Sequence, residues 1–285
     1  MLKLIYTNVR GESVELFGPP FRLISVEGLG DVDADIQTQK SPYQDGSTHI
    51  DTTLTERLIS IEFKIVGNSI EEIQKYRKLI SSVFNPKLGL GTLQYIGKGE
   101  NKEIQALSEH VPYFPDGRGN RGRDYQKALI DLICPDPYWR DPRVISRALR
   151  AYQGRFTLPT TFPVELGIEG DTTILTNEGD TPAPITIDIQ GPVTNPQVIN
   201  KTTGKFIRVN LSLSENEVLH IDTGRPRRVE IYRDGRTIEN AMGYIDHYSD
   251  FWELSVGPNE VQYIADAGNA NAIVAVAWQN RYVGI

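Results

Sequence analysis

The stretch that most constrains this chain is residues 127–142, KALIDLICPDPYWRDP. Apolar side chains occupy every second position of its first half: Ala128, Ile130, Leu132 and Cys134. A period of two predicts a β-strand, and the partly apolar opposite face is typical of a strand in the middle of a sheet. The prolines that follow cannot donate a ladder hydrogen bond, so the strand is predicted to end at a rigid turn.

The turn itself carries two large aromatic residues, Tyr138 and Trp139. Aromatic side chains on a proline-braced corner commonly fix the end of a strand to a neighbouring surface. Two interpretations remain open at this point. The turn is either a buried corner of one domain or an anchor that holds a second domain or a partner chain.

The length and composition of the chain allow two folded domains. With 285 residues, 39% hydrophobic and 24% charged, it has the composition of an ordinary folded protein. Residues 1–158 are predicted to form an N-terminal β domain that ends in a basic connector, and residues 159–285 a second β domain. The connector, residues 143–163, holds four arginines and a proline-containing extended stretch, which predicts a stiff linker.

The first half is predicted to be antiparallel β-structure with one helix. The helix is expected at residues 69–84, because Ser69 and Glu72 have the spacing of a capping box and Asn85 before Pro86 ends the pattern. An apolar stripe at helical spacing is predicted to face the core: Ile70, Ile73, Leu79, Ile80, Val83 and Phe84. Turn signals separate the predicted strands, residues 2–6, 14–17, 21–26, 57–66, 92–96, 103–107 and 127–134.

Two polar segments interrupt this half. Residues 41–50 contain Asp45-Gly46, a pair that suits a tight hairpin tip. Residues 112–124 hold three glycines and three arginines with no apolar period, which predicts a long exposed loop.

The second half shows only the pattern of strands. Short alternating stretches with glycine- and proline-containing turns between them predict a two-sheet sandwich or jelly roll. No substantial helix is expected there. The predicted strands are residues 185–190, 197–200, 206–213, 218–222, 228–233, 251–256, 261–265 and 273–282.

No residue pattern in the chain indicates catalysis or a metal. The single cysteine excludes an internal disulfide and a cysteine zinc site, and the four histidines are scattered without metal-binding spacing. No nucleophile motif is present, and no spacing selects a glycosidase carboxylate pair. We therefore predict no enzyme activity, no cofactor and no metal.

The N-terminus lacks signal-peptide features, and no run of about 18 apolar residues exists. Synthesis in a cytoplasm without membrane insertion is therefore expected. Charge is distributed unevenly. Residues 1–158 hold 21 Lys+Arg and 20 Asp+Glu, a net charge of +1, whereas residues 159–285 hold 9 and 17, a net charge of −8. An acidic second half argues against a grip on nucleic acid, because phosphate binding depends on Lys and Arg.

One aromatic cluster allows a second type of function. Jelly rolls can bind sugars through exposed aromatics, and Tyr244, Tyr248 and Trp252 lie close together in the sequence. These three are the sugar-binding candidates. The alternation of Trp252 with Leu254 and Val256 instead favours a core position for Trp252.

The order of these elements resembles the distal tail proteins of siphophages, the tail-component family. In the first half the resemblance rests on residues 69–86 and on LIDLICPDPYWRD within residues 128–141. In the second half it rests on LTNEGDTPAP, PQVINKTTG, EVLHIDT, GPNEVQY and WQNRYVG, at residues 175–184, 196–204, 217–223, 257–263 and 278–284.

The resemblance implies a mainly β fold: an N-terminal β-rich domain with one α-helix, then a C-terminal jelly-roll or galectin-like β-sandwich. It also implies a structural protein of the virion. The N-terminal domains of six copies would form a ring at the tail tip that joins the tail tube protein to the tail-associated hub protein. The second domain would carry peripheral baseplate or receptor-binding proteins, and genome DNA would pass through the channel without specific binding.

Under this interpretation, assembly takes place in the bacterial host cytoplasm. The subunit-interface candidates are Asp45, Gly46, Asp116, Arg118, Arg121, Arg123, Tyr138 and Trp139. The alternative function is a carbohydrate-binding adhesin that recognises glycans of the host cell surface.

Overall fold

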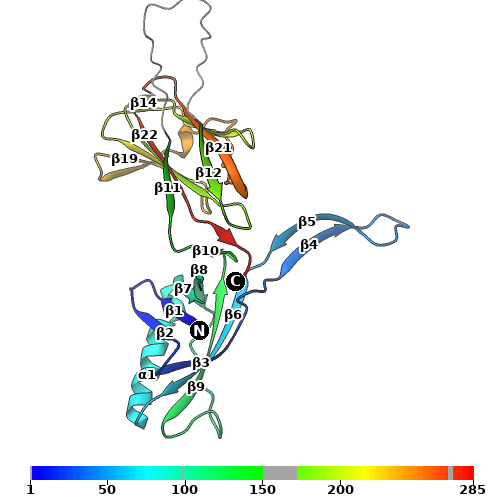
Figure 1. Cartoon of the computed structure of the whole chain (residues 1–285), viewed down its shortest axis with the longest axis vertical. Coiled ribbons are helices and arrows are strands. Elements are labelled where there is room, and N and C mark those ends of the chain that lie inside the picture. Colours follow the sequence, from blue (N-terminus) through cyan, green and yellow to red (C-terminus); the bar gives the residue numbers. More distant parts are fainter. Residues whose placement is uncertain (1, 98, 150–171, 269–271) are drawn as a thin grey trace, which may run out of the picture. The chain divides into compact units, whose positions relative to one another are not determined.

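The computed structural model describes residues 2–97, 99–149, 172–268 and 272–285. The chain forms two compact units, Met1–Pro142 with Tyr282–Ile285, and Arg143–Arg281. Both are built mainly from strands, and the described residues contain one α-helix, as predicted (Figure 1). The boundary predicted after residue 158 lies outside the described residues.

The N-terminal unit is built on one antiparallel sheet with the strand order β2-β1-β7-β8-β9-β6-β3. The central strand β9 lies between β8 and β6, which confirms the position predicted from its two partly apolar faces. Side chains alternate along β9, and those on its core face are fully buried. The strands are β1 (Lys3–Thr7), β2 (Ser13–Leu16), β3 (Phe21–Glu27), β6 (Arg57–Val66), β7 (Gly91–Ile96), β8 (Asn101–Ser108) and β9 (Tyr125–Cys134).

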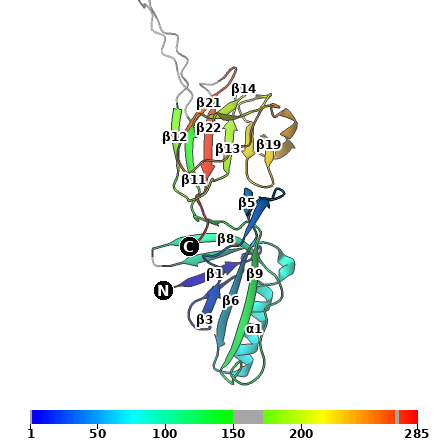
Figure 2. The ribbon, with the colours of Figure 1, turned by 90° about the vertical axis from the view of Figure 1, so that its right-hand side faces the viewer.

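Helix α1 (Ile70–Val83) covers the core face of this sheet and buries Ile80 and Val83 against it (Figure 2). Its start is capped as predicted, because Ser69 Oγ accepts from the Glu72 N–H at 3.2 Å. Glu72 reaches back to the N–H of Asn68 at 2.7 Å. The predicted apolar stripe was wrong at its edges: Ile70 is 53% exposed and Leu79 is 43% exposed. A 3₁₀ turn, η1 (Pro86–Leu88), follows the helix.

A two-stranded arm leaves the N-terminal unit between β3 and β6 (Figure 1). It consists of β4 (Ala34–Gln39) and β5 (Thr48–Leu54), which pair with each other and with no other strand of the described chain. The sequence indicated the hairpin tip but not these two strands. We call residues 33–54 the acidic arm, because they contain one Lys and four Asp, a net charge of 1 − 4, or −3 with His neutral.

The second unit is a two-sheet sandwich, in agreement with the predicted fold class. The larger sheet has the order β11-β22-β13-β18-β19-β20 and the smaller β12-β21-β15-β16, with buried aliphatic and aromatic side chains between them. The larger sheet contains β11 (Ile145–Leu149), β13 (Ile185–Gln190), β18 (Val218–Asp222), β19 (Arg228–Arg233), β20 (Thr237–Asn240) and β22 (Ile273–Trp278). The smaller contains β12 (Thr172–Asn177), β15 (Gln197–Asn200), β16 (Lys205–Arg208) and β21 (Gly257–Ile264).

Several details of the second half differ from the prediction, which also lacked β12 and β20. Residues 251–256 form no strand, because the partner strand β12 pairs with β21 from Gly257 onward, where a turn was expected. Residues 206–213 are divided between β16 and the short β17 (Ser212–Leu213), which pairs with β14 (Val193–Thr194). Residues 145–149, assigned to the connector, instead pair as β11 with β22.

The chain returns to the N-terminal unit at its last residues. The predicted strand over residues 273–282 is divided, and Tyr282 lies in β23 (Arg281–Tyr282), which pairs with β10 (Trp139–Arg140). The Tyr282 hydroxyl donates to Asp141 at 3.0 Å, and Lys102 Nζ lies 3.4 Å from the centre of its ring. The second unit is therefore inserted between Pro142 and Tyr282 of the first.

Candidate functional site

A buried arginine holds together the base of the acidic arm, the proline-rich turn and the final residues. Arg57, at the start of β6, is fully buried. Its guanidinium donates to the carbonyl oxygens of Gly28, Leu29, Asp31, Pro137 and Val283. Burial lowers the pKa of Arg57 from its usual value. Backbone oxygens fixed around it offset the loss of water, which is how a buried charge is tolerated.

Gly28 lets the backbone reach this arginine. It has φ of +87°, and a Cβ placed there would come within 1.9 Å of the Leu58 carbonyl oxygen. Only glycine fits that position, so the chain can turn out of β3 toward the arm. The Thr55 N–H then closes the base of the arm by donating to the Asp33 carbonyl at 2.9 Å.

The proline-rich turn is a buried corner of the N-terminal unit, the first of the two interpretations left open by the sequence. Trp139 has no exposed surface, and its indole N–H donates to the Leu29 carbonyl at 2.9 Å. Its ring packs edge-on against Tyr95. Tyr138, beside it, is partly exposed.

The predicted interface residues at the arm tip lie on the surface. Asp45 and Gly46 are exposed between β4 and β5, and Gly46 has φ of +75°. Tyr43 beside them is entirely exposed. The tip is shaped by Gln44, whose side chain accepts from the Ser41 N–H at 3.0 Å and donates to Thr48 Oγ1 at 3.1 Å.

The predicted loop at residues 112–124 is exposed but closely attached to β9. Tyr113 and Leu129 exchange two backbone hydrogen bonds of 2.9 Å, and Gln126 Nε2 donates to the Pro115 carbonyl at 2.8 Å. Of the interface candidates here, the structure brings Asp116 and Arg121 together in an ion pair of 2.8 Å. The exposed candidates of this loop are Asp116, Arg118, Arg121 and Arg123.

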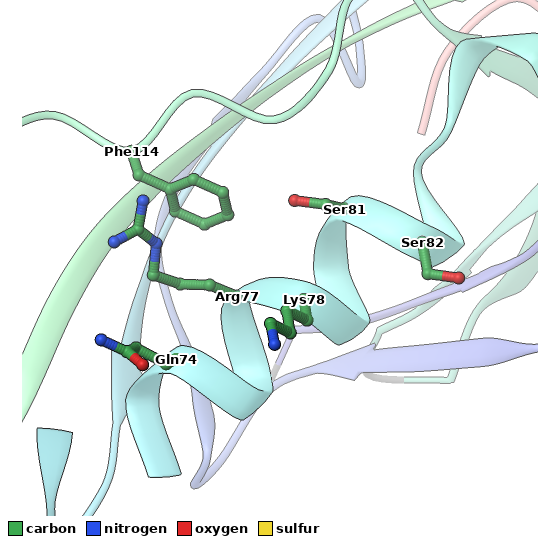
Figure 3. A pocket seen from close by; sticks show the side chains of 6 residues that line it. All are labelled: Gln74, Arg77, Lys78, Ser81, Ser82 and Phe114. Carbon is green, nitrogen blue, oxygen red and sulfur yellow. The ribbon is translucent and has the colours of Figure 1, made fainter. Parts of the chain in front are cut away.

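A groove of about 540 Å³ lies between this loop and helix α1 (Figure 3). We call it the basic groove, because its lining carries two cations and no carboxylate: Gln74, Arg77, Lys78, Ser81, Ser82 and Phe114. The helical members repeat at intervals of three and four residues, so they form one polar stripe along α1. The Arg77 guanidinium lies 4.6 Å from the centre of the Phe114 ring.

The carboxylates near this stripe are already used by the helix start. Glu72 accepts from the Asn68 N–H and from the Tyr76 hydroxyl, and these bonds lower the pKa of Glu72. Glu71 also lies in the first turn, and hydrogen bonds from its own N–H and from Ser69 lower its pKa. The basic groove therefore presents mainly hydrogen-bond donors and positive charge.

In the second unit the three sugar-binding candidates have different environments. Tyr248 is 79% exposed and Tyr244 is 44% exposed. Trp252 is buried in the core of the sandwich, where Leu254 is buried as well. The structure thus presents the two tyrosines on the surface and Trp252 in the interior.

Comparisons with known proteins cover both units. The phage tail protein RIFT-related domain matches residues 9–134, and the siphovirus-type tail component C-terminal domain matches residues 178–282. This chain belongs to the siphophage tail-component family. It is therefore a structural component of the distal tail or baseplate of a phage.

Solved structures share the fold over the whole chain. The SPP1 Dit protein, described as a paradigm of the hub adsorption apparatus in phages that infect Gram-positive bacteria, matches with a TM-score of 0.70 at 11% identity. The match covers 99% of each chain. A chain of the phage P2 baseplate, in its activated conformation with Ca, matches with a TM-score of 0.58 at 12% identity over 100% of this chain and 99% of that one. No curated protein matches the chain.

Sequence reasoning missed Arg57, the strands of the arm and the basic groove. Arg57 stands at the first position of a clearly predicted strand, and nothing in its neighbours indicates burial. The arm strands are rich in Thr, Gln and Asp, so their apolar alternation is weak. The groove depends on residues 74–82 and Phe114, which only the tertiary fold brings together.

Proposed function

We propose that this protein forms a homo-hexameric ring at the tail tip. The ring joins the tail tube protein to the tail-associated hub protein and anchors peripheral baseplate or receptor-binding components. The observation that carries this proposal is the structural match to the SPP1 Dit protein across both units and 99% of each chain. A shared domain order over the full length supports a shared architectural role.

The two units are assigned different parts of this function. The N-terminal unit carries the extended arm and the exposed loop, so we assign the ring to it. The interface candidates Asp45, Gly46, Asp116, Arg118, Arg121 and Arg123 lie on the surface of this unit. Trp139 and Tyr138 would contribute indirectly, because they fix the proline-rich turn, and the Trp139 indole of that turn binds the Leu29 carbonyl near the base of the arm.

The remaining parts of the proposal concern the setting. Assembly takes place in the host cytoplasm, and genome DNA passes the ring without specific binding. The described part of the chain contains no helix long and apolar enough to cross a bilayer. It also contains no group of three or more His, Cys, Asp or Glu side chains that could hold a metal ion.

Light scattering and negative-stain microscopy of the purified full chain test the ring. Particles of six copies with a central hole are expected, either alone or after addition of the tail tube protein. A chain that stays monomeric and does not bind the tube protein would overturn the proposal.

Exposed aromatic side chains support a second candidate function, the carbohydrate-binding adhesin. Tyr248 and Tyr244 present their rings on the surface of a sandwich fold. A glycan array with the full chain tests it: binding should be lost in Tyr248→Ala and kept in Tyr43→Ala, which removes an exposed tyrosine from the other unit. Absence of binding to any host cell-wall glycan would exclude this function.

A further inference from the structure

The acidic arm has the properties of a segment that packs against another protein surface. A two-stranded hairpin in water is marginally stable on its own. Every residue of β4 is exposed, as is every residue of β5 except Leu54. Ile36 and Ile50 leave 61% and 58% of their surface in water. The strands nevertheless keep a regular register apart from one bulge.

The two faces of the arm differ in chemistry. Residues that pair across the hairpin point to the same side, so Asp35 and Thr53 share a face with Gln37 and Asp51. The opposite face carries Ala34 with Leu54 and Ile36 with Thr52. One face therefore carries Asp35 and Asp51, and the other carries Ala34, Leu54 and Ile36 together with Thr52, Thr38 and His49.

The basic groove offers the complementary surface. Arg77 and Lys78 line it together with two serine hydroxyls and an amide, and Phe114 adds an apolar side. Charged groups of opposite sign on two facing surfaces favour encounter and fix their register. A hairpin with two aspartates on one face and with Ile36 and Leu54 on the other matches a groove of this composition.

The arm cannot occupy the groove of its own chain. Figures 1 and 2 show the arm leaving the N-terminal unit on the side away from α1, and the groove lies on α1. The Arg57 hydrogen bonds to the carbonyls of Gly28, Leu29 and Asp31 fix the base from which the arm departs. The groove that it fits therefore belongs to a different molecule.

We propose that the acidic arm of one copy of this chain docks in the basic groove of a second copy. This inference rests on the proposed ring and names the contact that closes it. A contact between two different patches is heterologous, and repetition of such a contact around an axis produces a closed ring. The acidic face of the arm, Asp35 and Asp51, would meet Arg77 and Lys78.

Charge reversal in the full chain tests the contact. In Arg77→Glu/Lys78→Glu, and separately in Asp35→Lys/Asp51→Lys, the concentration at which the ring half dissociates should rise about tenfold or more. Combination of the four changes should restore assembly, because the charges are exchanged. Lys87→Glu, an exposed reversal in η1 outside the groove, is the matched control and should assemble like the natural chain.

Crosslinking identifies the partner. A photoreactive residue at Tyr43 or Ile36, in a mixture of isotopically light and heavy protein, should form light–heavy crosslinks to residues 74–82 or Phe114. Crosslinks to another surface, to the same copy or to the tube protein would overturn the inference and leave the ring itself standing. If neither the chain alone nor the chain with the tube protein forms a ring, the inference fails together with the proposed function.

Discussion

Replacement of Arg57 by methionine should destabilise the N-terminal unit and leave the second unit unchanged. Methionine keeps the apolar stem and removes the donors to the five carbonyl oxygens, among them Gly28 at 2.9 Å and Asp31 at 2.7 Å. Each hydrogen bond from a charged donor contributes about 1.5–3 kcal/mol. The cost of burying the guanidinium, several kcal/mol, offsets much of that sum.

The expected net loss is therefore about 3–5 kcal/mol in the free energy of unfolding of the N-terminal unit. With a urea dependence of about 2 kcal/mol per M, the midpoint should fall by about 2 M. Arg57→Lys should recover less than half of the loss, because one ammonium with three donors cannot reach carbonyls on both sides.

The single cysteine allows this unit to be followed separately. Cys134 is fully buried in β9, and burial raises the pKa of its thiol to about 12. It should react with a thiol reagent only after the N-terminal unit opens. Two of the three tryptophans, Trp252 and Trp278, lie in the second unit. Tryptophan fluorescence therefore reports mainly the unfolding of that unit.

The control is Arg22→Met, which removes an exposed arginine from β3 and should change the free energy of unfolding by no more than about 0.5 kcal/mol. If Arg57→Met changes the stability of the N-terminal unit by less than about 1 kcal/mol, the interpretation of Arg57 as its central hydrogen-bond donor is refuted.

Three further changes have defined outcomes. Tyr282→Ala removes the contact with Lys102 and the packing of the ring, so it should lower the free energy of unfolding of the N-terminal unit by about 2 kcal/mol. Labelling of Cys134 in urea measures this loss, and Tyr282→Phe should lose less. Ser69→Ala removes the α1 cap and should cost about 1 kcal/mol in the same assay, whereas a cost near zero would exclude the cap. The hydrogen bond to Asp188 raises the pKa of His220, so its stabilising contribution is present below the unfolded value of about 6.5 and is lost as pH rises through the folded value. The free energy of unfolding, followed by fluorescence, should be higher at pH 5.5 than at pH 8, and this difference should be larger by about 0.5 kcal/mol in the natural chain than in His220→Gln. Equal differences in the two proteins would contradict this account.

The sequence predicted the elements whose signals are local. The alternation in residues 127–134, the Ser69–Glu72 cap and most strands of the sandwich were found in the structure. The arm was predicted only at its tip, because its strands bury almost nothing and their residues follow no core pattern. The absence of a strand at residues 251–256 depends on the partner that β12 selects, Gly257 to Ile264, which local periodicity does not contain.

The candidate site was harder to predict for a related reason. An arginine bound by backbone oxygens has no side-chain partner that a sequence motif could reveal. The carbonyls that surround Arg57 come from three separate segments of the chain. Their meeting is a property of the fold and not of any one stretch.

The return of the chain to its first unit affects how such proteins can exchange parts during evolution. A module at the end of a gene can be replaced by a single recombination event. Here the second unit lies between Pro142 and Tyr282, so a working exchange needs two crossover points, one on either side of it. A hybrid with only the upstream crossover would inherit a foreign version of Tyr282–Ile285, and these residues must still fit Lys102, Asp141 and Arg57. A hybrid chain is therefore expected to fold only if its residues 282–285 still pack and hydrogen-bond with the N-terminal unit.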